Sequence, residues 1–332
     1  MDINMYGYTV FHDKIINTLI SGVHNGTASH AYIFEGPAGM YKHEAARLFA
    51  NALVCEHPQS SPCGECRSCV EARAGTNPDI ITVEHDKGAD GKPKKSIGAE
   101  SARKTVNSTY IKPFNSKRKI YIIPDAENMT VEAQNTFLKT LEEPPEYVVF
   151  IIIVPSAENL LQTVVSRSEV ISFTPVSAEK IKDYIKDRYP QETDRLEFLS
   201  RASGGIPGEA DKIIADKDFE RLRAEALQYL PKLLSGKISC AFEIEDFSVK
   251  NAERINEIID IWISYIRDLI ALHYRADDAI INSDKSDALR KLCHEIDTKK
   301  YMDAVKRLVE SKNMLQKSVK LSAVMLRCAL CL

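Results

Sequence analysis

Apolar and polar positions follow two different patterns along the chain. Up to about residue 173, continuously apolar runs at 31–35, 79–84, 119–125 and 147–154 alternate with stretches of helical spacing, among them 42–54 and 131–143. Runs that are apolar at nearly every position are typical of strands buried on both faces of a parallel sheet. Strands that alternate with helices therefore predict an α/β domain, a three-layer sandwich in which helices cover both faces of a parallel sheet.

After residue 173 only helical spacing remains. Short helices are expected at 177–188, 194–202 and 207–215, with Gly204-Gly205 between the second and the third. Longer amphipathic stretches follow at 252–274 and 299–332, with apolar residues three and four positions apart. The pattern predicts three parts: an α/β domain over 1–173, a small helical domain over 174–216 and an all-α domain over 217–332.

Composition and charge narrow the functional classes. The 332 residues are 44% hydrophobic and 27% charged, and 44 Lys and Arg against 47 Asp and Glu give a net charge of −3. No global basic field therefore attracts nucleic acid, and contact with DNA would need a local patch or basic partners. The longest apolar run, 147–154, falls well short of the ~20 residues of a membrane span. The N-terminus shows no secretory signal, so we expect a cytoplasmic protein.

The turn after the first apolar run has part of the sequence of a phosphate-binding loop. In that motif a Gly is followed by four residues and then by Gly-Lys-Ser/Thr. Gly36, Gly39 and Lys42 are present here, but Tyr41 replaces the second motif glycine and His43 replaces the hydroxyl residue that holds Mg²⁺. These changes favour a strand-to-helix turn without nucleotide over a weak nucleotide site.

The acidic motif expected at the end of the run 119–125 is also incomplete. Asp125 ends the run 119–125, where a magnesium-linked carboxylate would lie, but Ala126 follows where a hydrolytic site carries a second acid. Positioning and charge stabilisation supply nearly all of the catalysis of phosphoryl transfer, so these losses argue against turnover. Together with Gly36, Gly39 and Lys42, Asp125 is expected to form a degenerate nucleotide site that is empty or weak.

Four of the eight cysteines lie within fifteen residues, as Cys55, Cys63, Cys66 and Cys69. Clustered thiols in a cytosolic chain indicate a metal site rather than a disulfide framework. Two residues between successive cysteines let both sulfurs face one ion, and four thiolates make a closed, structural zinc site. An iron–sulfur centre and a redox Cys-x-x-Cys pair are the alternatives.

Several segments follow one another over about 180 residues in the order of a known family. Besides the cysteine cluster they are Ser29-His-Ala-Tyr-Ile-Phe-Glu-Gly-Pro-Ala-Gly39, 119–127, Asn135-Thr-Phe-Leu-Lys-Thr-Leu-Glu-Glu-Pro-Pro145, Ser166-Arg167-Ser168 and Ser203-Gly-Gly-Ile-Pro-Gly208. With these motifs the chain resembles the clamp-loader branch of the AAA+ proteins, among the subunits of bacterial DNA polymerase III. The resemblance implies an AAA+ domain with an inserted zinc module at about 55–69, a helical lid domain and an all-α collar domain for oligomerisation.

The resemblance also assigns roles to single residues. Active motor subunits have a polar sensor residue where this chain has Val154-Pro155, and a second-sensor arginine where it has Gly208. Arg167 is retained and matches the arginine of the family's Ser-Arg-Cys motif, with Ser168 in place of Cys. That arginine is implied to act as an arginine finger in trans, at the ATP site of a neighbouring subunit, because its fork of N–H groups can grip phosphate oxygens. The alternative is an arginine in a local salt bridge.

The expected function is therefore that of a subunit without ATPase activity of its own. The resemblance implies partners, namely ATPase subunits (gamma/tau) that bind ATP and a delta subunit, and an assembled complex that opens the sliding clamp and places it on primed DNA. One alternative is an ATP-hydrolysing motor subunit of the same complex. A less favoured one is a stand-alone zinc-containing DNA-binding protein.

Overall fold

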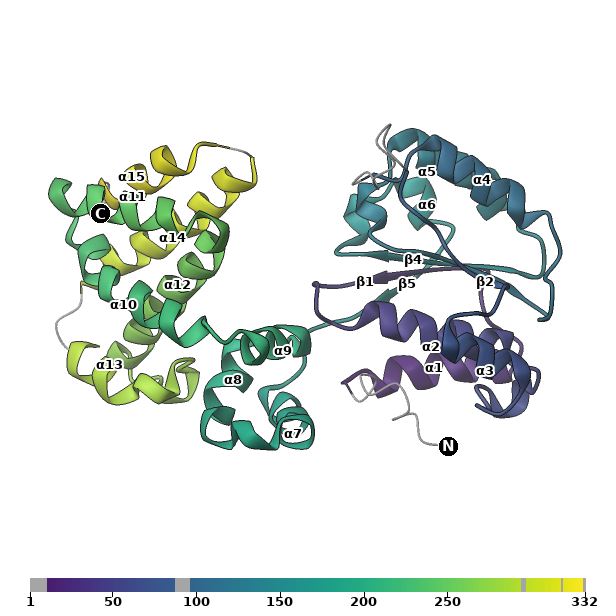
Figure 1. The fold of residues 1–332 in the computed structure, drawn as a ribbon, viewed down its shortest axis with the longest axis horizontal. Helices are drawn as coiled ribbons and strands as arrows, with labels where there is room; N and C mark the ends of the chain where they lie inside the picture. The colour runs from purple at the N-terminus through teal and green to yellow at the C-terminus, as the bar shows by residue number, and fades with distance from the viewer. Residues whose placement is uncertain (1–10, 87–95, 294–296, 318, 331–332) are drawn as a thin grey trace. The chain divides into compact units, whose positions relative to one another are not determined.

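The computed structural model describes residues 11–86, 96–293, 297–317 and 319–330. It divides the chain into two compact units (Figure 1). The first comprises Met1–Val176 with Ile206–Gly208, and the second comprises Ser177–Gly205 with Glu209–Leu332. Among the described residues, none of the helices combines the length and the apolar character that a bilayer crossing requires.

The first unit is built on a five-stranded parallel sheet. In chain order the strands are β1 (Ala31–Glu35), β2 (Ile80–Thr82), β3 (Lys119–Ile123), β4 (Val148–Val154) and β5 (Glu169–Ser172). Their order in the sheet is β2-β3-β4-β1-β5. Ala31 of β1 lies opposite Phe150 of β4, and Lys119 of β3 lies opposite Val148 of β4. The carboxyl ends of β1 and β3 therefore flank that of β4, which puts the turns after these strands at one edge.

Helices cover both faces of this sheet, as Figure 1 shows. On one face Tyr32 and Phe34 pack with α1 (Asp13–His24) and α2 (Lys42–Val54). On the other face Ala31 and Ile33 pack with α5 (Val131–Glu142) and with Ala102 of α4 (Ala99–Thr109). The short helices α3 (Arg67–Ala74) and α6 (Gln162–Val165) complete the unit. The predicted three-layer α/β arrangement is confirmed.

A buried carboxylate fixes the loop that leads into β3. Asp79 is 1% exposed, and its two oxygens accept the backbone N–H groups of Phe114 (2.6 Å), Asn115 (2.8 Å) and Ser116 (2.7 Å). Burial raises the pKa of Asp79, but the three N–H groups outweigh it and hold that pKa below its ordinary value. Lys119, at the start of β3, donates to the carbonyl oxygens of Ser108 in α4 and of Ile111 at the start of the same loop.

The second unit is entirely helical in its described residues. Its helices are α7 (Ala178–Arg188), α8 (Leu196–Ala202), α9 (Pro207–Ala215), α10 (Phe219–Ser235), α11 (Ile238–Lys250), α12 (Ile255–His273), α13 (Ser286–Leu292), α14 (Thr298–Gln316) and α15 (Leu321–Leu330). The first residues of α9 belong to the first unit. The separation of this unit into a lid and a collar stays a prediction.

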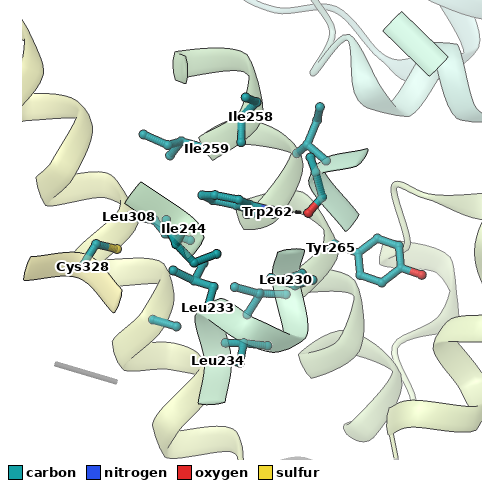
Figure 2. Close-up of a cluster of buried hydrophobic side chains, with 14 of the residues drawn as sticks. Leu230, Leu233, Leu234, Ile244, Ile258, Ile259, Trp262, Tyr265, Leu308 and Cys328 are labelled. Atoms are coloured by element: carbon teal, nitrogen blue, oxygen red, sulfur yellow. Dashed lines mark hydrogen bonds between the residues drawn. The ribbon is translucent and has the colours of Figure 1, made fainter. Parts of the chain in front are cut away.

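Trp262 of α12, the single tryptophan of the chain, lies in the core of the second unit. Figure 2 shows it among side chains of α10, α11, α12 and α14, which include Leu230, Leu233, Ile244, Ile258 and Leu308. The indole is fully buried, and its Nε1–H donates to the carbonyl oxygen of Ala226 at 2.7 Å. The apolar stripe of α12 is thus used to fill the core of its own unit.

Two features differ from the sequence prediction. The stretch 299–332 does not continue as one helix, because α14 ends at Gln316 and α15 begins at Leu321, where it packs against α11. The break lets the last apolar positions, among them Met325 and Cys328, enter the core of the unit. In addition, the strand β5 follows Ser168 and extends the sheet beside β1, where the apolar pattern predicted no strand.

Candidate functional site

The phosphate-loop segment lies between β1 and α2, as its sequence predicts. Gly36 has a φ of +146°, and a Cβ at this position would lie 2.2 Å from the carbonyl oxygen of Phe173, so only glycine fits. Tyr41 adopts the left-handed region, with a φ of +55°, where the motif has a glycine. The backbone shape of the loop is therefore retained, but a tyrosine side chain stands at the motif's second glycine. The His43 side chain is exposed at the surface.

Lys42 turns back into its own loop. Its side chain is buried, and its ammonium Nζ donates to the carbonyl oxygens of Gly36 and of Pro37, the latter at 2.8 Å. Burial lowers the pKa of Lys42, and the negative charges of Glu127 and Asp125 partly offset this effect. The lysine that would meet a phosphate in a working site thus has two intramolecular acceptors.

The backbone of Gly208 lies against the phosphate-loop segment at Gly39. The backbone N–H of Gly208 donates to the carbonyl oxygen of Gly39 at 3.0 Å. A Cβ at position 208 would lie 2.7 Å from the Gly39 Cα, so an arginine at this position would require the loop to move. Gly208 is where the family resemblance places a second-sensor arginine, and the structure fills that space with backbone.

Asp125 and its neighbours lie just beyond β3. Asp125 has a φ of +46° and starts a short 3₁₀ turn, Ala126–Asn128. Ala126 is fully buried and offers no carboxylate. Glu127 reaches the vicinity of Lys42, as its effect on the pKa of Lys42 indicates. Gly36, Gly39, Lys42 and Asp125 are thus brought to one edge of the sheet, but without the second acid that would orient an attacking water.

Arg167 follows α6, and its guanidinium is held by two elements of the first unit. Its Nη1 donates to the carbonyl oxygen of Thr163 at 2.9 Å and contacts the Ser166 hydroxyl oxygen at 3.4 Å. Its Nη2 donates to Glu142 Oε1 at 2.6 Å, from the last residue of α5. The Arg167 side chain is still one-third exposed. Arg167 therefore makes a local salt bridge within the first unit and also reaches solvent.

The four cysteines converge after α2. Cys55 caps the end of α2, Cys66 caps the start of α3, and Cys69 lies in its first turn. All four Sγ atoms, Cys63 included, lie within 4.8 Å of one another, and Cys63 Sγ and Cys69 Sγ are 3.9 Å apart. A tetrahedral site with metal–sulfur bonds of ~2.3 Å needs sulfurs about 3.8 Å apart. The four thiols therefore enclose the volume of one ion and leave no space for a cluster of several irons with its own sulfides.

Backbone N–H groups surround the sulfurs as they would surround thiolates. The N–H groups of His57 and Cys63 donate to Cys55 Sγ, that of Cys66 to Cys63 Sγ, and that of Cys69 to Cys66 Sγ, at 3.3–3.5 Å. Burial opposes ionisation of Cys63, but N–H groups of Cys66 and Glu65 lower its pKa to about 7. Burial raises the pKa of Cys69 and of Cys55. A bound cation is what would ionise all four thiols together.

Comparison with known proteins places the chain in a family. A family model described as "DNA polymerase III, delta subunit" matches residues 11–177, which is half of the chain. The chain belongs to this DNA polymerase III family. The model for the family's C-terminal part, "DNA polymerase III, delta subunit, C terminal", matches residues 218–324. The resemblance to DNA polymerase III subunits found in the sequence motifs is thereby confirmed.

Individual members of DNA polymerase III are similar over different lengths. The chain is 25% identical to DNA polymerase III subunit delta-prime of Bacillus subtilis over 319 residues, which cover 94% of this chain and 93% of that protein. It is 30% identical to subunit tau of the same organism over 199 residues, or 58% of this chain and 34% of tau. A solved structure of a gamma subunit-related protein from Thermotoga maritima aligns with a TM-score of 0.39 at 18% identity, covering 87% of this chain and 96% of that one.

Sequence reasoning did not identify Glu142 as the partner of Arg167. Glu142 belongs to the Leu-Glu-Glu-Pro-Pro string that carries the family resemblance, but 25 residues separate it from Arg167. One signal was available. A glutamate at the C-terminal end of a helix is unfavourable beside the negative end of the helix dipole, and a cation placed near it is stabilising there.

Proposed function

We propose that this chain is a delta-prime-type subunit of a DNA polymerase III clamp loader that does not itself hydrolyse ATP. Its role is to supply Arg167 to the ATP site of a neighbouring ATPase subunit, gamma or tau, so that the complex opens the sliding clamp and loads it on primed DNA. The similarity to a delta-prime subunit over 94% of the chain supports this assignment. A delta subunit completes the proposed assembly.

The observation that carries the proposal is the state of the phosphate loop. The ammonium of Lys42 is bonded to carbonyl oxygens of its own loop, and the backbone of Gly208 stands where a second-sensor arginine would act. The buried Ala126 offers no carboxylate to activate water. With these groups missing or engaged, positioning and charge stabilisation of a transferred phosphoryl group are lost. Gly36, Gly39, Lys42 and Asp125 then form a degenerate site that is empty or binds nucleotide weakly.

Arg167 supplies the remaining chemistry in this proposal. A guanidinium is always charged and presents parallel N–H donors, which suit the oxygens of a phosphoryl group that gains charge in the transition state. An arginine finger of this kind can increase the rate by ~10³-fold or more. The replacement of Cys by Ser168 leaves the charge on Arg167 unchanged.

The cysteine cluster is proposed to hold one structural zinc ion through Cys55, Cys63, Cys66 and Cys69. The close approach of the four sulfurs supports a closed, four-thiolate site, which leaves no position for a reacting water. The ion would join the end of α2 to the start of α3. Elemental analysis of the purified chain should give one zinc per chain, and iron in its place would overturn this part of the proposal.

The helical half of the chain is proposed to form a lid domain over 174–216 and a collar domain over 217–332 through which the subunits associate. After α12 has been used in the core, exposed apolar side chains remain on α11 and α14, among them Phe242, Val249, Met302 and Val309. Exposed apolar positions on packed helices fit association with helices of other subunits.

The decisive experiment measures ATP turnover by the purified chain, alone and assembled with the ATPase subunits, delta, the sliding clamp and primed DNA. We expect no turnover by the chain alone. In the assembly, Arg167→Ala should fold normally yet depress the ATPase stimulated by DNA and clamp.

Two outcomes would contradict the proposal. An unchanged ATPase in the Arg167→Ala assembly would refute the finger. Turnover by the chain alone would instead identify a motor subunit, a candidate that the retained Lys42 and Asp125 and the similarity to tau support.

A further inference from the structure

The contacts of Arg167 divide its guanidinium into an anchored end and a masked end. Nη1 is anchored to the Thr163 carbonyl oxygen, one turn earlier in the chain. Nη2 is masked by the carboxylate of Glu142 at 2.6 Å. In the part of the chain that the structure describes, the Nε–H of Arg167 makes no hydrogen bond. A phosphate gripped in a fork would need Nη2, because Nη1 already serves Thr163 and Ser166.

The position of Glu142 is not explained by the stability of its own helix. It is the last residue of α5, where the backbone carbonyls carry partial negative charge and a carboxylate is unfavourable. Glu143 adds a second acid at the same end. Arg167 supplies the compensating cation, and Glu142 alone of these two acids contacts it among the described residues. The ion pair therefore joins the end of α5 to the arginine after α6.

We propose that Glu142 is a latch on Arg167, a positioning residue that competes with the neighbour's phosphate for the Nη2 group. In the free chain the carboxylate neutralises the guanidinium and holds it against α5. In the assembled complex the more highly charged phosphate of the neighbour's ATP takes the place of the carboxylate, while Thr163 keeps the guanidinium at the end of α6. This inference rests on the proposed function and specifies how its arginine is controlled.

The latch is weak enough to be displaced and strong enough to be measured. The Glu142 side chain is half-exposed and that of Arg167 is one-third exposed, so solvent screens the pair. An exposed ion pair of good geometry changes an equilibrium constant by about 1.5- to 5-fold. The pair breaks when the guanidinium first meets the phosphate, before the bond to the leaving group is cleaved. Its removal should therefore lower the KM for ATP by that factor and leave kcat unchanged.

The test compares Glu142→Gln with Glu143→Gln in the full assembly of this chain, the ATPase subunits, delta, clamp and primed DNA. Both substitutions keep side-chain size and remove one charge from the same helix end, but only the first removes the carboxylate on Arg167. We expect Glu142→Gln to lower the KM for ATP about 1.5- to 5-fold and Glu143→Gln to leave it unchanged. The difference between Glu142→Gln and the native chain should shrink as salt is raised, because salt screens the pair.

A double-mutant cycle with Arg167→Ala shows whether Glu142 acts through Arg167. In the Arg167→Ala background, Glu142→Gln should change neither KM nor kcat. An equal effect in both backgrounds, no effect in either, or a fall in kcat like that of Arg167→Ala would each overturn the latch. If Arg167→Ala alone leaves the ATPase unchanged, the proposed finger fails, whereas a normal finger with a silent Glu142→Gln refutes only the latch.

Discussion

Replacing Asp79 by Asn should destabilise the first unit while leaving the second unchanged. The buried carboxylate accepts three backbone N–H groups, one at Oδ1 and two at Oδ2. An amide has a single acceptor oxygen, so at least one N–H would face the NH₂ group and remain unpaired. Hydrogen bonds to a charged group contribute about 1.5–3 kcal/mol each, and those that persist would weaken to neutral strength. The expected loss is about 3 kcal/mol.

The two units can be followed separately because Trp262, the only tryptophan, lies in the second. For a domain of 150–250 residues, about 3 kcal/mol corresponds to a fall in Tm of roughly 6–12 °C. Circular dichroism and calorimetry should show this fall for the first unit, while the transition seen by Trp262 fluorescence stays in place. A shift below about 1 °C would refute the view that the carboxylate holds this loop.

Three further outcomes are expected. Lowering the pH below about 4, the ordinary pKa of a free Asp, should destabilise the first unit of the native chain more than that of the Asp79→Asn variant. The reason is that a carboxylate whose pKa is lowered on folding stabilises the fold only while it is ionised. Parallel curves of Tm against pH between pH 3 and 6 would argue against this. Cys69→Ser should abolish bound metal in elemental analysis and lower the Tm of the first unit, whereas Cys240→Ser, in the second unit, should do neither. Gly36→Ala should lower the free energy of unfolding, measured in urea, by about 3 kcal/mol or more. Gly26 has a φ of +71° but open space around it, so Gly26→Ala should lower it by only about 1 kcal/mol. Equal losses would show that the close approach at Gly36 is unimportant.

The central strands were predictable because burial on both faces leaves a continuous apolar pattern. The runs 119–125 and 147–154 correspond to β3 and β4 within two residues. The strand β5, Glu169–Ser172, was not predicted, since it lies at the edge of the sheet and most of its side chains are exposed. At that position pairing with β1 decides the structure, and pairing leaves little trace in the apolar pattern.

In the candidate site, too, some features could be predicted from the sequence and others could not. The motif placed Gly36 and Lys42 at the end of β1, and cysteine spacing brought four thiols together, because both depend on short distances along the chain. The orientation of the Lys42 ammonium and the pairing of Glu142 with Arg167 depend on which acceptor lies nearest in space. Such choices between partners differ by little free energy and cannot be derived from spacing alone.

The inward turn of Lys42 also bears on how the loop between β1 and α2 would respond to free nucleotide. A ligand stabilises a protein by mass action, and the stabilisation grows with the logarithm of the ratio of its concentration to its dissociation constant. A nucleotide that must first displace two lysine–carbonyl bonds binds with a correspondingly larger dissociation constant. If the site is empty or weak as proposed, the ATP concentration acts on this unit only through Arg167 and the neighbouring subunit, and the loop between β1 and α2 keeps the same conformation whether ATP is plentiful or scarce.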